Sequence, residues 1–406
     1  MTDATPRAAP ARPTMGFVEL VAFLAIIMAL NALAIDVVLP GLPALGAELG
    51  VAGGNQRQLV IVVYLVGMGA SQLVYGALAD RIGRRPTLLI GLAIYGLAGL
   101  ASAVAPSFGA LLAARVAQGL GAGSPRVVAV SIARDRYRGS EMAQVMSLVT
   151  MVFMVVPVLA PSLGQAVLWV AGWRWIFGVL AVGGALVATW AGVRLAETLA
   201  PAHRRSLSPM AVARGLREVV TTRATAVPIV AMTLMQGVVM AFVTSAQQVY
   251  QDTYGVGAAF PLWFALIALT MSVAAFGNAR LVRTLGPAAL ARRALHVMIV
   301  SAGAMAALAA TDHLGLAAYE ALACVVLMSF GFVGSNLNAL AMEPMGHLAG
   351  TASSVLGAIT TIGGGLVGGA VGHLYDGTPR PLALGVLGLA LVARATLWLA
   401  PATRAG

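Results

Sequence analysis

The chain has 406 residues, of which 60% are hydrophobic and only 10% are charged, whereas roughly a quarter of the residues of an ordinary soluble domain are charged. This composition excludes a soluble globular protein and favours an integral membrane protein. The net charge is +11, so the distribution of the basic residues decides whether they form a nucleic-acid-binding surface or a topology signal.

Twelve apolar blocks follow one another along the chain, separated by short polar breaks. A helix needs about 20 apolar residues to cross the hydrocarbon of a bilayer, and the blocks are of about this length. They therefore predict an all-α integral membrane protein with twelve transmembrane helices. The predicted spans are 17–39, 56–79, 87–105, 108–131, 143–168, 173–194, 226–250, 261–281, 291–310, 315–341, 349–373 and 381–400.

All 25 basic residues are arginines, and they are distributed unevenly between the two sides of the predicted membrane domain. Three (Arg57, Arg174 and Arg380) fall in loops on one side, whereas 20 fall in loops and termini on the other. Cytoplasmic loops carry the excess of basic residues, so this pattern places both termini in the cytoplasm and implies no nucleic-acid partner. The 20 residues are Arg7, Arg12, Arg81, Arg84, Arg85, Arg134, Arg136, Arg138, Arg194, Arg204, Arg205, Arg214, Arg217, Arg223, Arg280, Arg283, Arg292, Arg293, Arg394 and Arg404.

Two ionisable residues lie at similar predicted depth in the outer half of the membrane. Asp36 comes late in the first span and Arg115 early in the fourth, and a charge in hydrocarbon is costly. We expect the two side chains to be neighbours. One interpretation is a static ion pair between helices. The other is a carboxyl that faces a cavity and binds and releases a proton, with the arginine tuning its pKa.

The loop GALADRIGRRP, Gly76 to Pro86, separates the second and third spans. Its charged residues Asp80, Arg81, Arg84 and Arg85 prevent it from entering the bilayer. The loop therefore predicts a tight hairpin between two spans, with its arginines on the cytoplasmic side.

Spans 4 and 5 contain further unusual residues. Arg126 follows Pro125 in the inner half of span 4, where it can reach the headgroups, line a cavity or attract an anionic substrate. Pro157 and Pro161 each remove a backbone donor from span 5 and indicate a cavity wall, a hinge or a plain kink. The candidate cavity residues are Asn31, Gln118, Arg126, Met151, Met154, Pro157, Pro161, Gln236 and Asn336.

The longest polar stretch, 197–224, divides the chain into six spans before it and six after it. Transporters built from two similar halves have this layout, with the substrate site between the halves. The predicted parts are a cytoplasmic tail 1–16, a half 17–196, the linker 197–224, a half 225–400 and a tail 401–406. Residues 208–220 of the linker form either a short helix on the membrane face or a solvated tether.

Other polar and glycine-rich features of the spans have simpler interpretations. Glu320 and Glu343, near the two ends of span 10, are predicted to be interfacial, and the glycines of Gly363–Gly372 to form packing surfaces. The sequence has no phosphate-binding GxxxxGK[ST] loop, and its five histidines have no ligand spacing. We therefore expect no enzyme, no ATP-driven pump, no metal and no cofactor, and an ion gradient or facilitated diffusion as the driving force.

The loop after span 2 resembles the hallmark loop of the major facilitator superfamily, with Gly76, Leu78, Asp80, Arg81, Gly83, Arg84 and Arg85 in the matching places. ARVAQGLGAG (114–123) is similar to the span-4 motif of its twelve-span drug:proton antiporters. VVPVLAPSLG (155–164) is similar to their span-5 motif. LPGLP (39–43), GWRWIF (172–177) and AGTASSVLGA (349–358) resemble the bicyclomycin/chloramphenicol-resistance subfamily, although Val37 and Val38 stand where that subfamily usually has Met-Tyr.

The resemblance implies two six-helix halves, with Asp36 as the proton-linked carboxylate and Arg115 as its partner. It also implies a gating loop (Gly76, Asp80, Arg81, Gly83, Arg84, Arg85), in which the charge of Asp80 faces the start of span 11 near Gly350 and Thr351.

The function expected from these features is proton-coupled export of amphipathic drugs or toxic compounds across a bacterial inner membrane, by a monomer that alternates access. A first alternative is an exporter of one metabolite, such as an amino acid or sugar derivative. A second alternative is a transporter-like sensor, which the short loops disfavour.

Overall fold

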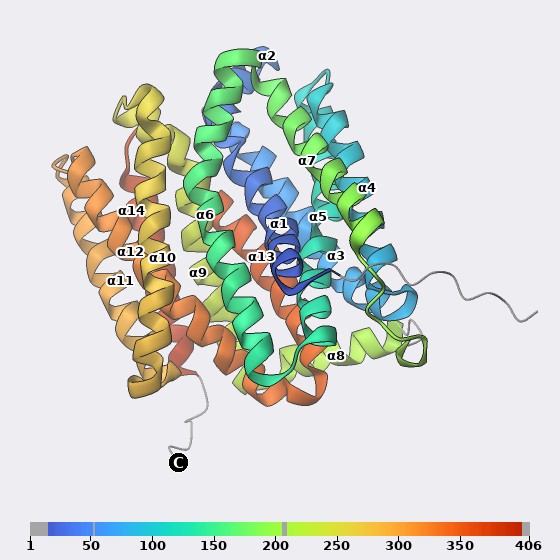
Figure 1. Cartoon of the computed structure of the whole chain (residues 1–406). Helices are drawn as coiled ribbons and strands as arrows, with labels where there is room; N and C mark the ends of the chain where they lie inside the picture. The colour runs from blue at the N-terminus through green and yellow to red at the C-terminus, as the bar shows by residue number, and fades with distance from the viewer. Residues whose placement is uncertain (1–14, 52, 205–208, 400–406) are drawn as a thin grey trace, which may run out of the picture.

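The computed structural model describes residues 15–51, 53–204 and 209–399, and these residues form helices joined by short loops (Figure 1). Arg7, Arg12, Arg205 and Arg404, and with them most of the predicted terminal tails, lie outside the described residues. The prediction of an all-α membrane protein is confirmed.

Twelve helices of 19 to 33 residues run through the described part of the chain. Their ends differ by only a few residues from the predicted spans, as for span 2, predicted at 56–79 and observed at Leu59–Ile82. They are α1 (Phe17–Asp36), α3 (Leu59–Ile82), α4 (Arg84–Ala103), α5 (Phe108–Arg136), α6 (Gly139–Ala171), α7 (Trp173–Arg194), α9 (Arg223–Gln247), α10 (Phe260–Leu285), α11 (Pro287–Ala310), α12 (Leu316–Met342), α13 (Ala349–His373) and α14 (Arg380–Trp398).

Ten segments of the described chain are long and apolar enough to cross a membrane. One of them, Leu316–His373, contains both α12 and α13. Helix α5 is not among the ten, because Arg115, Gln118 and Arg126 lower its hydropathy. The least apolar of the twelve helices is therefore the one that carries candidate site residues.

Shorter elements mark the two ends of the bundle. One end, here named the α2 end, carries η1 (Leu39–Gly41), α2 (Leu42–Glu48), η2 (Gly54–Gln58) and η5 (Gly257–Ala259) (top of Figure 1). The other, the α8 end, carries η3 (Pro201–His203), η6 (Glu343–Leu348) and α8 (Pro209–Thr221), which runs across the bottom of the bundle. The linker thus forms a helix, as one of the two interpretations of the sequence expected.

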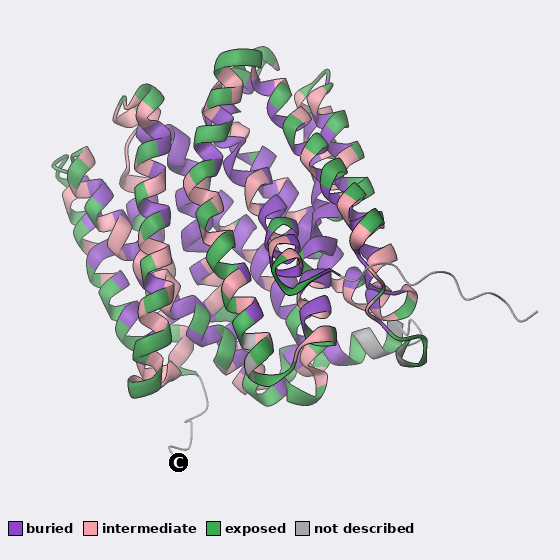
Figure 2. Cartoon of the chain, viewed as in Figure 1, coloured by how far each residue is buried: buried purple, intermediate pink, exposed green. Residues whose placement is uncertain are grey.

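Exposed residues cover the outside of the bundle (Figure 2), and many of them are large and apolar. Leu97 on α4, Leu262 on α10 and Val300 on α11 are 69%, 72% and 72% exposed. Exposed apolar surface on this scale is stable only against hydrocarbon, so these faces contact lipid.

Helix α13 packs between α3 and α9 through its glycines. A Cβ atom added to Gly369 would lie 2.5 Å from a methyl carbon of Val62 on α3. On the other face, a Cβ atom added to Gly368 would lie 2.5 Å from Cβ of Met240 on α9. Glycine is needed at both positions because the neighbouring helices approach so closely. The predicted packing surface at Gly363–Gly372 is confirmed.

Candidate functional site

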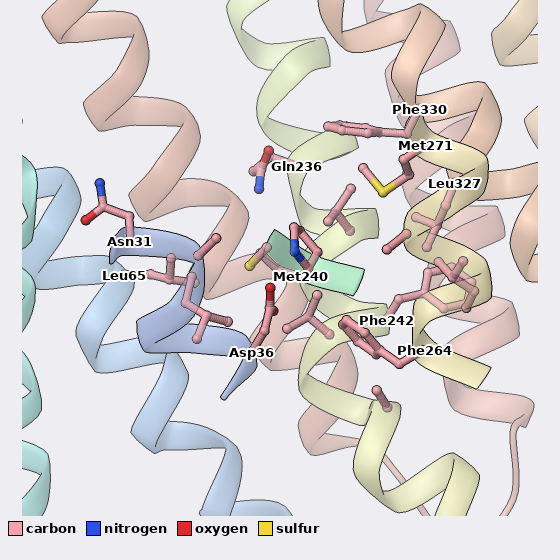
Figure 3. Close-up of a pocket in the computed structure, with 18 of the residues that line it drawn as sticks. Asn31, Asp36, Leu65, Gln236, Met240, Phe242, Phe264, Met271, Leu327 and Phe330 are labelled. Atoms are coloured by element: carbon pink, nitrogen blue, oxygen red, sulfur yellow. The ribbon is translucent and has the colours of Figure 1, made fainter. Parts of the chain in front are cut away.

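A cavity of about 380 Å³ lies between the two halves of the bundle. Figure 3 shows residues of α1 and α3 facing residues of α9, α10 and α12 across it. Its lining is mostly apolar, with methionines from four helices (Met28, Met68, Met232, Met240 and Met271) and the phenylalanines Phe153, Phe242, Phe264 and Phe330. Thioether and aromatic side chains of this kind adapt to apolar ligands of different shape.

One acidic residue, Asp36, and one basic residue, Arg126, are among the residues that line this cavity. Asp36 is the last residue of α1 and is 6% exposed, and Figure 3 shows its carboxyl directed toward the space between the helices. Within the described residues, no hydrogen bond or ion pair of its carboxylate is recorded. Arg126, on α5, is exposed to the same cavity and likewise has no recorded partner in the described chain. Both groups are therefore available to a ligand.

Arg115 points away from the cavity and is fully buried. Its Nε atom donates to the carbonyl of Val60 at 3.1 Å, and its Nη2 atom donates to the carbonyl of Ala34 at 2.8 Å. Its guanidinium carbon lies 4.3 Å from the ring centroid of Tyr64. Carbonyl oxygens and the π face of Tyr64 thus stabilise a buried cation that has no carboxylate partner among the described residues.

The static ion pair between Asp36 and Arg115, one of the two interpretations of the sequence, is not formed in this structure. Arg115 instead binds the backbone of α1 at the carbonyl of Ala34, two residues before Asp36. Gln118, predicted to line the cavity, instead accepts a hydrogen bond from Arg115 Nη1 at 2.6 Å. Similar depth in the membrane does not fix which face of a helix a side chain occupies, so the sequence alone left both interpretations open.

The remaining candidate cavity residues divide into two groups. Asn31, Arg126, Pro157 and Gln236 line the cavity. Met151, Met154, Pro161 and Asn336 do not. Met151 is 48% exposed on the outside of α6, and the amide of Asn336 donates to Asn278 Oδ1 at 2.6 Å.

The last turn of α3 and the first turn of α4, which only Gly83 separates, are part of a charge cluster at the α8 end. Asp80 pairs with Arg84 at 2.5 Å, and Arg84 also pairs with Asp135 of α5 at 2.9 Å. The carboxylate of Glu197 accepts hydrogen bonds from the backbone N–H groups of Arg84 and Arg85, the first two residues of α4. An anion at a helix N-terminus is stabilised by the unpaired N–H groups there.

The turn before α4 requires its glycine. Gly83 has φ +107°, and a Cβ atom there would lie 2.3 Å from the carboxylate of Glu197. The expected contact of Asp80 with the start of α13 is not recorded. Asp80 is bound to Arg84 instead, and its side chain is 46% exposed. Gly76 of the same segment does approach α13, since its added Cβ would lie 2.8 Å from Ser354 Oγ.

Hydrogen bonds between the two halves gather at the α2 end. Asn55 donates to the carbonyls of His373 and Tyr375, both at 2.8 Å. Gln58 is 3% exposed and donates to Gln248 and to the carbonyl of Gly372. These contacts bring the two halves together at this end of the bundle.

A second layer of contacts surrounds this closure. Arg57 lies 3.8 Å from Asp252 of the π-helical segment η4 (Gln248–Thr253). The hydroxyl of Tyr375 is 2.7 Å from that of Thr253, and burial raises the pKa of the Tyr375 phenol, which keeps it neutral. Sequence reasoning missed this layer, because partners such as Gln58 and Gln248 are 190 residues apart.

Glu320 and Glu343 differ in their surroundings. Glu320, predicted to be interfacial, is 4% exposed and lies inside the second half. Glu343 is exposed. The prediction for Glu320 was wrong because hydropathy gives the depth of a residue but not whether it faces lipid or protein.

The sequence matches the Major Facilitator Superfamily over residues 24–369. It is 31% identical over 359 residues to the uncharacterized MFS-type transporter YdgK of Bacillus subtilis, and the aligned region covers 87% of each chain. It is 29% identical over 363 residues to the bicyclomycin resistance protein homolog of Haemophilus influenzae, covering 88% of this chain and 90% of that protein. It is 30% identical over 333 residues to the multidrug resistance protein MdtL of Klebsiella pneumoniae, covering 82% of this chain and 83% of that protein.

The fold is also similar to that of a solved structure, a D-xylose-proton symporter. The TM-score is 0.74 at 13% sequence identity, over 96% of this chain and 99% of that one. At this identity the likeness concerns the fold alone.

Proposed function

The chain belongs to the Major Facilitator Superfamily, and on that premise we propose that it exports amphipathic toxic compounds, drugs among them, in exchange for protons. As a member of this family it is a multi-pass membrane protein that transports small molecules, and it is not an enzyme. The names of two relatives, a bicyclomycin resistance protein homolog and a multidrug resistance protein, support a drug as the substrate.

The observation that carries the proposal is an unpaired carboxyl, Asp36, in an otherwise apolar cavity. Methionine and phenylalanine side chains offer an amphipathic compound contact area without a fixed shape. Asn31, Arg126 and Gln236 offer a small number of polar contacts to its polar part.

Proton exchange is assigned to Asp36. A carboxylate that is buried and unpaired is unfavourable, and a bound proton removes its charge. Loss of that proton restores a charge that water or a substrate in the cavity has to stabilise. Substrate and proton therefore compete for one group, and this competition couples their movements in opposite directions.

Arg115 has the role of a positioning residue in this proposal. It fixes the backbone of α1 beside Asp36 through the carbonyl of Ala34 and connects it to α3 through the carbonyl of Val60. The carboxyl is therefore held at the cavity wall while the rest of the bundle changes its arrangement.

The closure at the α2 end supports a conformation with access from the α8 end. The arginine distribution supports the cytoplasm of a bacterial cell as the α8 side, with both termini and the linker 197–224 there. On this assignment the halves 17–196 and 225–400 rock about the cavity and give alternating access across the inner membrane. The cavity is complete within one chain, which supports a monomer as the working unit.

The test is uptake into inverted membrane vesicles under an imposed pH gradient, with a panel of cationic, neutral and anionic amphipathic compounds. We expect accumulation of several compounds that depends on the gradient and is abolished by a protonophore. Vesicles with the Asp36→Asn protein serve as the control for proton coupling. Accumulation of one metabolite alone, or uptake that is indifferent to the gradient, would contradict the proposal.

A further inference from the structure

A second buried carboxyl lies in the other half of the bundle, outside the cavity wall. Glu320 is on the second turn of α12 and is 4% exposed. Its Oε2 atom accepts a hydrogen bond from the hydroxyl of Tyr250 at 2.5 Å, and its Oε1 atom lies 3.7 Å from the sulfur of Cys324. Within the described residues, no arginine or histidine is recorded in contact with it.

The groups around Glu320 are phenols and a thiol. Tyr250 and Tyr254 belong to or directly follow η4, and Tyr319 and Cys324 belong to α12. Helices α10 and α11 also pack on α12, but their basic residues lie toward the α8 end: Arg280, Arg283, Arg292, Arg293 and His296. No cation of the described chain therefore pairs with a charged Glu320, and the same holds for Asp36 in the first half.

Glu320 is connected to the cavity by one side chain. Tyr250 lines the cavity, and its hydroxyl is bound to the carboxyl of Glu320. Tyr319 also lines the cavity, and its buried hydroxyl has no recorded hydrogen-bond partner in the described chain. The hydroxyl of Tyr250 therefore lies between the buried carboxyl and the water or substrate of the cavity.

We propose that Glu320 is a second proton-binding site of this transporter, and that it exchanges its proton with the cavity through the hydroxyl of Tyr250. In the charged state, Tyr250 donates its hydrogen bond to Glu320. To load the site, the phenol passes its proton to the carboxylate and takes one from a hydronium ion in the cavity, which becomes water. The neutral Glu320 then donates to Tyr250, and one proton has moved with no other bond changed.

The backbone at Tyr250 supports a function in coupling. Tyr250 is the third residue of η4, and π-helical segments of this kind occur frequently at functional sites. The same segment carries Gln248, bound to Gln58, and Asp252, beside Arg57. A change in the hydrogen bond of Tyr250 therefore acts on the element that holds the two halves together at the α2 end.

This inference rests on the proposed proton-coupled export, but its test does not depend on transport. The pH titration of protonated carboxyl groups is followed by infrared spectroscopy in the full-length protein, purified in lipid nanodiscs without substrate. We expect Glu320→Gln to remove one titrating carboxyl band and Asp36→Asn to remove a different one. Tyr250→Phe keeps the Glu320 band but shifts its titration. Glu343→Gln, at an exposed acid beyond the opposite end of α12, leaves both bands unchanged.

A structural role for Glu320 predicts a different outcome. If the carboxyl only holds Tyr250 in place, Glu320→Gln lowers the melting temperature and leaves every titrating band as in the wild type. That result overturns the inference. It does so even when pH-driven uptake by the wild type is normal, in which case the proposed function still stands. If Glu320→Gln does not fold, the Tyr250→Phe protein decides the question. A Tyr250→Phe protein whose carboxyl bands all titrate as in the wild type also overturns the inference.

Transport measurements in proteoliposomes complete the test. We expect Glu320→Gln to reduce the number of protons exchanged per substrate by about one, with substrate still transported, whereas Asp36→Asn abolishes uphill transport. An unchanged proton count in a folded Glu320→Gln protein contradicts a role of this site in coupling. Absence of pH-driven transport by the wild type contradicts the proposed function and this role together, whichever bands titrate.

Discussion

The guanidinium of Arg115 donates a hydrogen bond to the carbonyl of Ala34, two residues before Asp36 on α1 (Nη2···O 2.8 Å). A buried cation thus supports the helix end that carries the cavity carboxyl without neutralising that carboxyl. The two residues are linked through the backbone, so their substitution has separable effects on stability and on coupling.

The first prediction concerns this separation. Asp36→Asn removes no hydrogen bond or ion pair recorded in the structure, so its melting temperature stays close to that of the wild type. Arg115→Ala leaves the carbonyls of Ala34 and Val60 without their partner and destabilises the protein by roughly 2–5 kcal/mol. Thermal unfolding in detergent measures both.

We also expect Asp36→Asn to lose pH-driven transport and to keep downhill exchange. A stable Asp36→Asn protein that still concentrates substrate removes Asp36 from the coupling role.

The second prediction concerns Asp80, in the last turn of α3. Asp80→Asn keeps the size of the side chain but removes its charge, and this weakens the pair with Arg84, which also holds Asp135. We expect reduced turnover with nearly unchanged substrate affinity, because Asp80 lies at the α8 end and does not line the cavity. Transport rates as a function of substrate concentration separate the two quantities. An equal loss of affinity would place Asp80 in contact with the substrate path.

The third prediction concerns closure at the α2 end. Gln58→Ala removes the hydrogen bonds to Gln248 and to the carbonyl of Gly372 and leaves buried polar groups unpaired, so conformations open at this end become more populated. Spin labels at residues 56 and 374, placed in a protein in which Cys324 has been replaced, report the change. The distance between the two labels, one in each half, is expected to increase.

Arg57→Ala provides the comparison for this experiment. Asp252 is 46% exposed and the pair is 3.8 Å apart, so the ion pair contributes only about 0–1 kcal/mol. We expect little change in the distance distribution of Arg57→Ala. A large opening by Arg57→Ala, with none by Gln58→Ala, would reverse this ranking of the contacts.

The fourth prediction concerns the packing of α13. A Cβ atom added to Gly368 meets Cβ of Met240 at 2.5 Å and the backbone of α9 at 2.7 Å. Gly368→Ala is therefore expected to destabilise the protein by roughly 1–3 kcal/mol. Gly388→Ala on α14 is the matched control, because no atom lies within 4 Å of its added Cβ and the change favours helix by about 0.5–1 kcal/mol. Melting temperatures that move in the same direction would contradict the described contact.

The fifth prediction concerns topology. Reporter fusions at residue 210, in α8, and at the C-terminus are both expected to indicate the cytoplasm, because the arginine excess lies on the side of the linker. A signal from the outside for either fusion would contradict the proposed orientation.

The sequence was sufficient to predict the twelve spans, because a helix in hydrocarbon must be long and apolar along its whole length. It also identified Asp36 and Arg126 as cavity candidates, since a charge in an apolar span is costly unless it meets water, a ligand or a partner. The partners of Arg115 were not predictable, because most of them are carbonyl oxygens and aromatic faces that every sequence contains. The burial of Glu320 was not predictable either, because it depends on how η4 packs against α12, 70 residues away from Tyr250.

The glycine-mediated contact between α3 and α13 extends along both helices, from Gln58 beside Gly372 to Gly76 beside Ser354. Two bodies that touch along one line can rotate about that line with little loss of contact. In the proposed alternating access, we expect this line to be the axis of rotation, so that displacement grows with distance from it. Helices at the edges of the bundle, such as α7 and α11 (Figure 1), are then expected to move the furthest. Bulky substitutions along the axis are expected to slow the motion of both halves.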